Sequence, residues 1–409
     1  MKRLPLTGIR VLDLGRILAA PLAAQSLGDL GAEVIKVERP GAGDGSRHFG
    51  PPFLKDRDGH DTHESPMYLS ANRNKRSVTI DLAQPLGQEL VRQLAAQSDV
   101  LIENYKVGDL ERYGLDYASI RAINPRIIYC SVTGFGQSGP YSARPGYDTV
   151  FQGMSGMMSV TGLPDGVPGG GPMKTGPSMA DFLSGQYATE GILAALYERD
   201  THSGEGQHID IALLDCMIAA QSHYVATYLA TGVVPVRRGT EGNGGLPSQA
   251  FPCQDAGVVV ICGTEPQYRA FCQALGHPEL GTDPRFATNA LRVANRVDMT
   301  RTFNALTQSW RAAELLQALM AAGVPCGPIN NYAEVFADPQ VQHRGLVQAM
   351  EHAQAGPMQL CANPIRFTGH APRTPLAPPV LGQHTQEVLQ ERLGLDTAAL
   401  SALQTDRII

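Results

Sequence analysis

The feature that most constrains the fold is an alternation of strand and helix patterns over the first 135 residues. Short apolar runs typical of buried strands occupy residues 10–14, 33–38, 77–82, 99–103 and 126–132. Segments with helical periodicity lie between them, at residues 19–30, 86–94 and 116–123. Strands joined by helices of about ten residues are typical of a parallel sheet with helices on both faces. The sequence therefore predicts an α/β fold with a doubly wound parallel sheet.

In such a sheet, ligands bind in the loops that follow the carboxyl ends of the strands. These loops are residues 15–21, 39–47, 104–108 and 134–140. Although the net charge is −6, basic residues recur in and near the loops, namely Arg16, Arg39, Arg47, Lys75, Arg76, Lys106, Arg112 and Arg144. Each alone is more often a solvated surface charge, but cations gathered at strand ends indicate a polyanionic ligand such as a nucleotide with phosphates.

The remainder of the chain predicts a second, smaller domain. Two long helical patterns cover residues 180–199 and 211–231, and a Gly-rich break at 236–247 indicates a boundary. A hairpin pattern at 249–262 and helices at about 266–275, 294–309 and 312–322 indicate a small α+β domain. We therefore expect a large domain over residues 1–232, a small domain over 233–328 and a C-terminal segment over 329–409.

Composition and charge exclude several classes of protein. A chain that is 43% hydrophobic with a net charge of −6 is neither disordered nor a basic nucleic-acid binder. No uncharged apolar run reaches the roughly 18–20 residues of a membrane span, and because the first 15 residues contain no apolar h-region we expect no export signal. The seven cysteines are scattered without a C-x-x-C pair, which predicts reduced thiols and no metal site. We expect a cytoplasmic enzyme with no nucleic-acid or membrane partner.

Two short patterns do not support a site. Residues 134–139 match G-x-G-x-x-G, but the following segment contains Pro140 and Pro145 and cannot begin the helix that a dinucleotide site requires. His60 and His63 flank Asp61 in a polar loop, for which a solvated loop is a better interpretation than a metal site.

Asp181 lies where a Gly/Pro-rich loop becomes a helix, and two interpretations of it stay open. An aspartate in a first helical turn is favoured as a cap and by the helix dipole. A carboxylate there can also act as a nucleophile toward an activated acyl group, with nearby amides holding the oxyanion.

The chain resembles the class III CoA-transferases, the family of formyl-CoA transferase and carnitine CoA-transferase. The matching segments are VLDLGRILAAPLAAQSLGDLGAEVIKVERPGAGDGSR (11–47), NRNKRSVTIDL (72–82), ENYKVGDLERYGL (103–115), IIYCSVTGFGQSGPYSARPGYD (127–148), MADFLSGQYATEGILAAL (179–196) and SGEGQHIDIALLD (203–215). Details such as GDGSRHFGPP are most similar to members that take CoA from succinyl-CoA for short dicarboxylic acids.

The resemblance implies a role for particular residues. Asp181 matches the catalytic aspartate, and Gly242, Gly244 and Gly245 match a glycine-rich loop that closes over it. Positions that match residues lining the CoA site are Ile17, Ala19, Arg39, Lys75, Asn104, Tyr105, Arg112 and Arg144. The substrates would be acyl-CoA thioesters and small carboxylic acids, with no permanently bound cofactor and no metal. The implied fold is a Rossmann-like large domain, completed by the C-terminal segment, plus a small domain, in an interlocked homodimer.

Two departures from the family pattern, and one difference from a related branch, limit these implications. Leu18 replaces the glutamine of formyl-CoA transferases, and Ala20 replaces a glycine, adding a methyl group near the cofactor. Tyr147 replaces the histidine with which related 2-methylacyl-CoA racemases move a proton. The expected activity is therefore CoA transfer through an aspartyl-CoA thioester. A racemase is the first alternative, and a non-catalytic CoA-binding regulator is the second.

Overall fold

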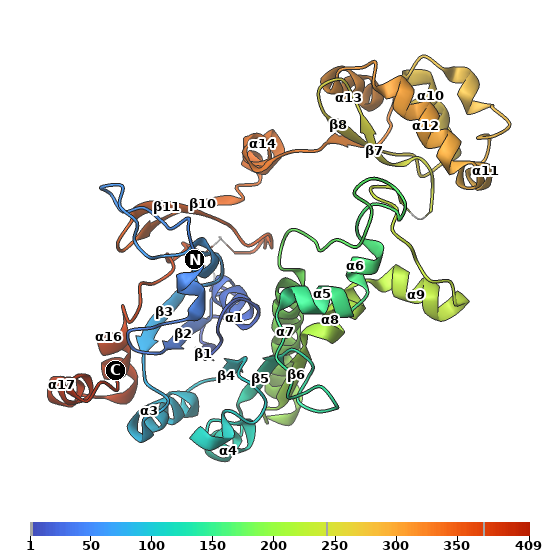
Figure 1. The fold of residues 1–409 in the computed structure, drawn as a ribbon. Coiled ribbons are helices and arrows are strands. Elements are labelled where there is room, and N and C mark those ends of the chain that lie inside the picture. Colours follow the sequence, from blue (N-terminus) through green and yellow to red (C-terminus); the bar gives the residue numbers. More distant parts are fainter. Residues whose placement is uncertain (1–2, 243, 371–372) are drawn as a thin grey trace. The chain divides into compact units, whose positions relative to one another are not determined.

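The computed structural model describes residues 3–242, 244–370 and 373–409 and divides the chain into two compact units (Figure 1). The first unit contains the residues up to Met158, Lys174–Val234 and Arg344–Ile409. The second contains Ser159–Met173 and Pro235–His343. These bounds differ from the expected ones at 232 and 328, partly because residues 159–173 bond with the start of the later segment. The Gly239 amide donates to the Gly162 carbonyl at 2.9 Å, and Arg237 pairs with Asp165.

The first unit is built on a parallel sheet of six strands in the order β3-β2-β1-β4-β5-β6. The strands are β1 (Arg10–Asp13), β2 (Glu33–Glu38), β3 (Lys75–Thr79), β4 (Val100–Glu103), β5 (Ile128–Thr133) and β6 (His208–Ala212). All five strand pairs are parallel, and the order reverses between β1 and β4. The predicted α/β class and parallel sheet are confirmed, and the reversal is the place where such sheets bind ligands.

Helices cover both faces of this sheet (Figure 1). Alternate strand residues point to opposite faces: Val11 packs in one apolar core and Leu12 in the other. The first face is covered by α1 (Ala19–Asp29), α5 (Asp148–Met154), α7 (Met179–Glu198) and α8 (Leu213–Ala220). The second is covered by α3 (Pro85–Ala96), α4 (Tyr117–Ile123), α16 (Thr385–Leu393) and α17 (Thr397–Thr405). The C-terminal helices thus pack on the sheet that the N-terminal residues form.

The other elements of the first unit are α2 (Pro66–Ala71), α9 (Ser222–Thr231) and the antiparallel pair β10 (Val347–His352) and β11 (Gly356–Cys361). The short helix α6 (Met157–Val160) lies where the two units meet in the sequence. No helix in the described ranges is long and apolar enough to cross a membrane.

The second unit has an antiparallel sheet of three strands with its own apolar core. The strands are β7 (Ser248–Pro252), β8 (Gly257–Ile261) and β9 (Cys326–Pro328). The helices are α10 (Glu265–Ala274), α11 (Asn289–Ala294), α12 (Arg296–Thr307), α13 (Ala312–Ala321), α14 (Tyr332–Ala337) and α15 (Pro339–His343). Aromatic rings fill the core, with Phe303 in contact with Phe271 at 5.0 Å between ring centroids.

The structure corrects one predicted element. Residues 211–231, expected as one helix, contain the end of edge strand β6 followed by α8 and α9. The two helices are separated at Gln221, whose side-chain amide donates to the carbonyls of Met217 and Ser155 at 2.9 Å each.

Candidate active site

A cavity of about 350 Å³ lies at the carboxyl ends of the parallel strands, within the first unit. All four loops singled out from the sequence contribute to its lining. Of the residues predicted for the site, it is lined by Ile17, Ala19, Asn104, Tyr105, Arg144 and Asp181. The structure therefore brings the predicted nucleophile together with five of the eight predicted CoA-lining residues.

Asp181 lies in the first turn of α7 without acting as its cap. The N-cap residue, Ser178, makes no side-chain capping bond. Instead Asp148, the first residue of α5, accepts a hydrogen bond from the Ala180 amide at 2.7 Å and another from Gln152 at 2.7 Å. Among the described residues, no hydrogen bond or ion pair reaches the Asp181 carboxylate. The capping function that the sequence suggested for Asp181 is thus performed by Asp148.

The surroundings of Asp181 favour its protonated form. Burial, together with the smaller effect of the negative charge of Asp148, raises the pKa of this carboxyl group to about 7. At neutral pH a substantial share of the group is ionised, and that ionised share has neither a salt bridge nor a donor to stabilise it. Such a carboxylate is more nucleophilic than one held by a cation.

Two cavity loops are bound to each other through Asn104. Its side-chain oxygen accepts from the Arg16 amide at 2.8 Å, and its side-chain nitrogen donates to the Arg16 carbonyl at 2.7 Å. The next residue, Tyr105, lies beneath the Arg16 guanidinium, which is 4.1 Å from the ring centroid. The Tyr105 amide in turn donates to the Glu103 carboxyl at 2.7 Å. Asn104 and Tyr105 therefore fix the position of Arg16.

Buried charges hold the first loop from below. Lys36 donates to the Gly15 carbonyl at 2.7 Å and pairs with Asp44 at 3.0 Å. Asp44 accepts from the Ile17 amide at 3.0 Å. Ile17 has a φ of +67°, which is unfavourable for a β-branched residue. Burial acts to raise the pKa of Asp44, but Lys36 and the amide donors outweigh it and hold that pKa well below its usual range.

Three predicted CoA-lining residues do not line this cavity. Lys75 is buried and donates to Asp13, the Pro21 carbonyl and Asn72 at 2.7, 2.8 and 2.9 Å. Arg112 is exposed and pairs with Asp109 at 3.5 Å. Arg39 is exposed at the end of β2. Lys75 supports the fold of the first loop, whereas contacts of Arg39 and Arg112 with CoA stay predictions.

The two departures from the family pattern also lie away from the cavity lining. Ala20 is buried, and its methyl group faces Gly15. A Cβ added to Gly15 would lie 2.6 Å from the Cβ of Ala20. The Ala20 methyl group therefore fills the interior of the loop and is not part of the cavity lining. Leu18 is also buried and precedes α1.

The glycine loop belongs to the second unit. Gly242, Gly244 and Gly245 precede β7, and the Gly242 amide donates to the Ser248 carbonyl at 2.8 Å. Closure of this loop over Asp181 stays a prediction.

Arg16 and Lys106 were named from the sequence only as two of the cations near strand ends, and Tyr147 only as a departure from the racemase motif; all three line the cavity. Arg16 and Lys106 lie in the loops after β1 and β4, so their position at strand ends was a usable signal. The capping role of Asp148 had no such signal, because it depends on α5 meeting the start of α7.

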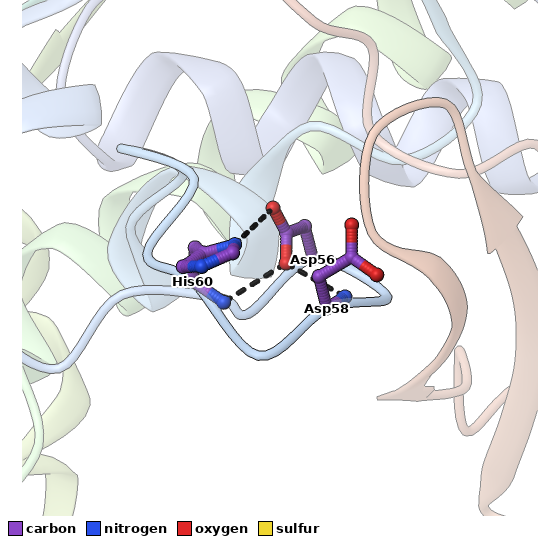
Figure 2. A group of neighbouring side chains, drawn as sticks. All are labelled: Asp56, Asp58 and His60. Atoms are coloured by element: carbon purple, nitrogen blue, oxygen red, sulfur yellow. Dashed lines mark hydrogen bonds and ion pairs between the residues drawn. The ribbon is translucent and has the colours of Figure 1, made fainter.

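Among the described residues, one group of side chains of the metal-ligand types lies outside the cavity, formed by Asp56, Asp58 and His60 (Figure 2). Figure 2 shows the Asp56 carboxylate turned back on its own loop, where it accepts from the amides of Asp58 and His60 at 2.9 Å each. These contacts explain the cluster as a loop motif.

Comparison with known proteins places this geometry in a family. The profile of CoA-transferase family III matches residues 6–385. The chain is 44% identical over 395 residues to succinate–glutarate CoA-transferase of Agrobacterium fabrum, covering 95% of each chain. It is 42% identical to human succinyl-CoA:glutarate CoA-transferase, covering 99% of this chain and 90% of the human one. A crystal structure of a CaiB/BaiF family protein from Brucella suis aligns with a TM-score of 0.85 at 43% identity, covering 96% of this chain and all of the other.

Proposed function

The chain belongs to CoA-transferase family III, and we propose that it moves CoA from succinyl-CoA to a short dicarboxylic acid, with Asp181 as the nucleophile. The observation that supports the nucleophile is its setting: an unpartnered carboxylate lines a cavity at the carboxyl ends of the strands. The names of these two relatives, which give succinate or succinyl-CoA and glutarate as substrates, support the substrate class. A 2-methylacyl-CoA racemase, the alternative left open by the sequence, is not supported by these relatives.

The reaction exchanges one thioester for another and is nearly thermoneutral, so the enzyme has to lower barriers. The Asp181 carboxylate attacks the donor thioester carbonyl, and CoA leaves as a thiolate. The thiolate attacks the Asp181 carbonyl of the mixed anhydride, releasing the donor acid and forming an aspartyl-CoA thioester. The acceptor carboxylate then displaces the thiolate, which attacks the acceptor carbonyl of the second anhydride and frees Asp181. The covalent intermediates divide the exchange into several steps, each with a lower barrier than direct exchange.

Water would hydrolyse both the anhydrides and the thioester, so it has to be excluded. We propose that the loop containing Gly242, Gly244 and Gly245 provides this exclusion, since a glycine-rich segment can change conformation at little cost. CoA thioesters are substrates here, and the function requires no resident cofactor.

We further propose that the enzyme is a homodimer. Large apolar side chains are exposed on and after α9: Leu229 is 75% exposed, Val234 67% and Val233 61%. Several large apolar side chains exposed within one short segment are typical of protein interfaces. A cytoplasmic location stays a prediction.

The substrate proposal is tested by incubating the enzyme with succinyl-CoA and a panel of monocarboxylic and dicarboxylic acids, with mass detection of new CoA esters. We expect glutaryl-CoA or the ester of another short dicarboxylic acid to form. Formation of monocarboxylic esters alone would contradict the substrate class.

The nucleophile is tested with Asp181→Ala and Asp181→Asn. Both variants should fold and bind CoA while transfer falls by several orders of magnitude. Because the pKa of Asp181 is raised in the folded state, ionisation of this group costs stability as pH rises from about 4 toward 8. Asp181→Asn should therefore gain in melting temperature relative to wild type at about pH 8, and gain less at about pH 5.

The capping interpretation predicts the opposite result. Loss of a helix cap would cost about 0.5–2 kcal/mol of stability and leave transfer nearly intact. Hydroxylamine added during turnover of the wild type should convert the activated carboxylate to a hydroxamate, with the mass change in the peptide that contains Asp181. Near-normal transfer by Asp181→Ala would contradict the assignment, and Asp148 would be the next candidate for the nucleophile.

A further inference from the structure

We propose that Arg16 binds the carboxylate of the substrate acid that does not react, and that this residue thereby selects dicarboxylic over monocarboxylic acids. The inference rests on the proposed function, because it concerns the same cavity and reaction.

The chemistry of a dicarboxylic acid requires a cation in the cavity. One carboxylate becomes part of an anhydride and then a thioester, so it loses its charge. The other stays anionic throughout, near the acidic pair Asp148 and Asp181. An anion in a partly buried cavity is costly unless a cation or several donors compensate it.

Three cations line the cavity: Arg16, Lys106 and Arg144. None of them has a salt bridge to another described residue, so each is available to an anionic ligand. Arg144 is stacked beside the Tyr141 ring, 4.4 Å from its centroid, in the loop after β5. All three side chains are exposed, and the Lys106 ammonium differs in being a point charge on a flexible stem.

Arg16 differs from the other two in how firmly it is held. Both of its backbone polar groups bond with Asn104, and Tyr105 lies under the guanidinium plane. Stacking on a ring leaves the edge of the guanidinium free, and that edge presents the paired N–H groups that match a carboxylate. The planar group is thus oriented before a ligand arrives.

The loop beneath Arg16 is also fixed on both sides of the residue. Lys36 binds the carbonyl of Gly15, and Asp44 binds the amide of Ile17. Ile17 is kept in a left-handed conformation that costs roughly 1–2 kcal/mol. A strained, over-determined loop next to a cavity is typical of a functional position. Here the strain places Arg16 and Ile17 in the same cavity lining.

One cation can serve both halves of the reaction. Asp181 reacts first with the donor acyl group and then with the acceptor acid, so both acids occupy the same place in turn. Succinyl and glutaryl groups each have a remote carboxylate. Arg16 can therefore bind the remote carboxylate of the donor acyl group and then that of the acceptor acid.

The test compares Arg16→Gln and Arg16→Lys with Arg121→Gln, a matched change in an exposed arginine of α4 that lies outside the cavity. Three quantities are measured: KM for succinate with glutaryl-CoA as donor, isotope exchange between butyrate and butyryl-CoA, and Kd for free CoA by calorimetry. Arg16→Gln should raise the KM for succinate by about tenfold or more, with Kd for CoA and butyrate exchange changed by less than about twofold. The KM of Arg16→Lys for succinate should lie between those of wild type and Arg16→Gln, because lysine keeps the positive charge and loses the planar guanidinium.

Two results would overturn the inference. An unchanged KM for succinate in Arg16→Gln would show that another group binds the remote carboxylate. An equal loss of CoA affinity, or an equal loss of butyrate exchange, would show that Arg16 binds CoA or merely supports the loop. Failure of the proposed function is distinct, since wild type itself would then transfer no CoA from succinyl-CoA to any acid.

Discussion

Asp148, the first residue of α5, and Asp181, in the first turn of α7, meet at the start of α7, yet their surroundings give them different roles. Asp148 accepts two hydrogen bonds and holds the first turn of α7 in place. Asp181 accepts none from the described residues, and its pKa is raised by burial and by Asp148 to about 7. One carboxylate thus fixes the helix and raises the pKa of the other.

This pairing predicts the pH dependence of transfer. The nucleophile has to be ionised, so kcat/KM for the acyl-CoA donor should fall by about tenfold per pH unit below the pKa and level off above it. The midpoint should lie near 7, the pKa of Asp181. In Asp148→Asn the oxygen that caps α7 is kept while the negative charge is lost, so the midpoint should move to lower pH. The measurement is a steady-state pH profile of wild type and variant.

Glu103 supplies the control for this profile. Burial raises its pKa to about 7 as well, despite hydrogen bonds from Ser131 and the Tyr105 amide that lower it. Glu103→Gln should leave the acidic limb of the profile in place. If that limb disappears in Glu103→Gln and persists unshifted in Asp148→Asn, the titrating group is Glu103.

Tyr147 predicts that the enzyme does not racemise. It lines the cavity and is 73% exposed, at the position where related racemases have a histidine. A phenol has an ordinary pKa of about 10 and is a poor base at neutral pH. In deuterium oxide, a 2-methylacyl-CoA should therefore gain no deuterium at C2. Deuterium incorporation at a rate comparable to CoA transfer would favour the racemase.

At the scale of single residues, the sequence was a better guide to which side chains lie together than to the role of each side chain. The resemblance pointed to Asn104, Tyr105, Arg144 and Asp181, and the strand-end rule pointed to the first three as residues in or near the loops; all four meet in one cavity. Lys75 was assigned to CoA because it is a cation in a family motif. Its burial with Asp13 depends on β1 and β3 lying on either side of β2, which no local pattern reveals.

At the scale of elements, the position of Asp181 depends on the close packing of α7 against α1. Gly185, one turn after Asp181, faces α1: an added Cβ would lie 2.9 Å from the Ala19 carbonyl oxygen and 3.0 Å from the Leu22 Cβ. The missing side chain lets the two helix backbones approach. The same contact joins two sides of the cavity, because Ala19 lines it as well.

Gly185→Ala should therefore be destabilising, although alanine is favoured over glycine in a helix by about 1 kcal/mol. The backbone of α1 cannot yield as a side chain can, so α7 should shift and transfer should fall with the melting temperature. Gly153→Ala in α5 is the control, because its Cβ would meet only the Met158 sulfur at 3.7 Å. Thermal melts and initial rates of both variants check this. Equal or greater stability of Gly185→Ala would contradict the packing argument.

Strand and helix periodicity predicted β1, β2, β4 and β5 within a residue or two, because these strands are short apolar runs between clear helices. It missed β6, the edge strand, whose exposed and partly buried residues alternate instead of forming an apolar run. The division of residues 211–231 was also hidden, since Gln221 separates α8 from α9 through bonds to distant carbonyls, without glycine or proline.

At the scale of the whole molecule, the first unit is made of three stretches of chain and the second of two. The chain leaves the first unit after Val234 and re-enters it at Arg344, and the C-terminal helices then pack on the sheet. A chain with this path forms a large loop that starts and ends on one unit. Two such loops can be threaded through each other, which is the assembly that the family resemblance implied.

An interlocked homodimer predicts behaviour that an ordinary dimer lacks. Its interface should be well above about 2,000 Å², so sedimentation at nanomolar concentration should still show twice the mass of one chain. Linked loops separate only when at least one unit unfolds, so dissociation is limited by unfolding. Tagged and untagged dimers mixed under native conditions should therefore form no hybrids over days, and should form them after denaturation and refolding.

A charge placed on the exposed apolar segment, as in Leu229→Glu, should reduce the yield of refolded dimer, because Leu229 would be buried on assembly. Rapid hybrid formation without denaturant would show that the subunits are not linked, and an active monomer would show that the exposed apolar side chains after α9 have another purpose.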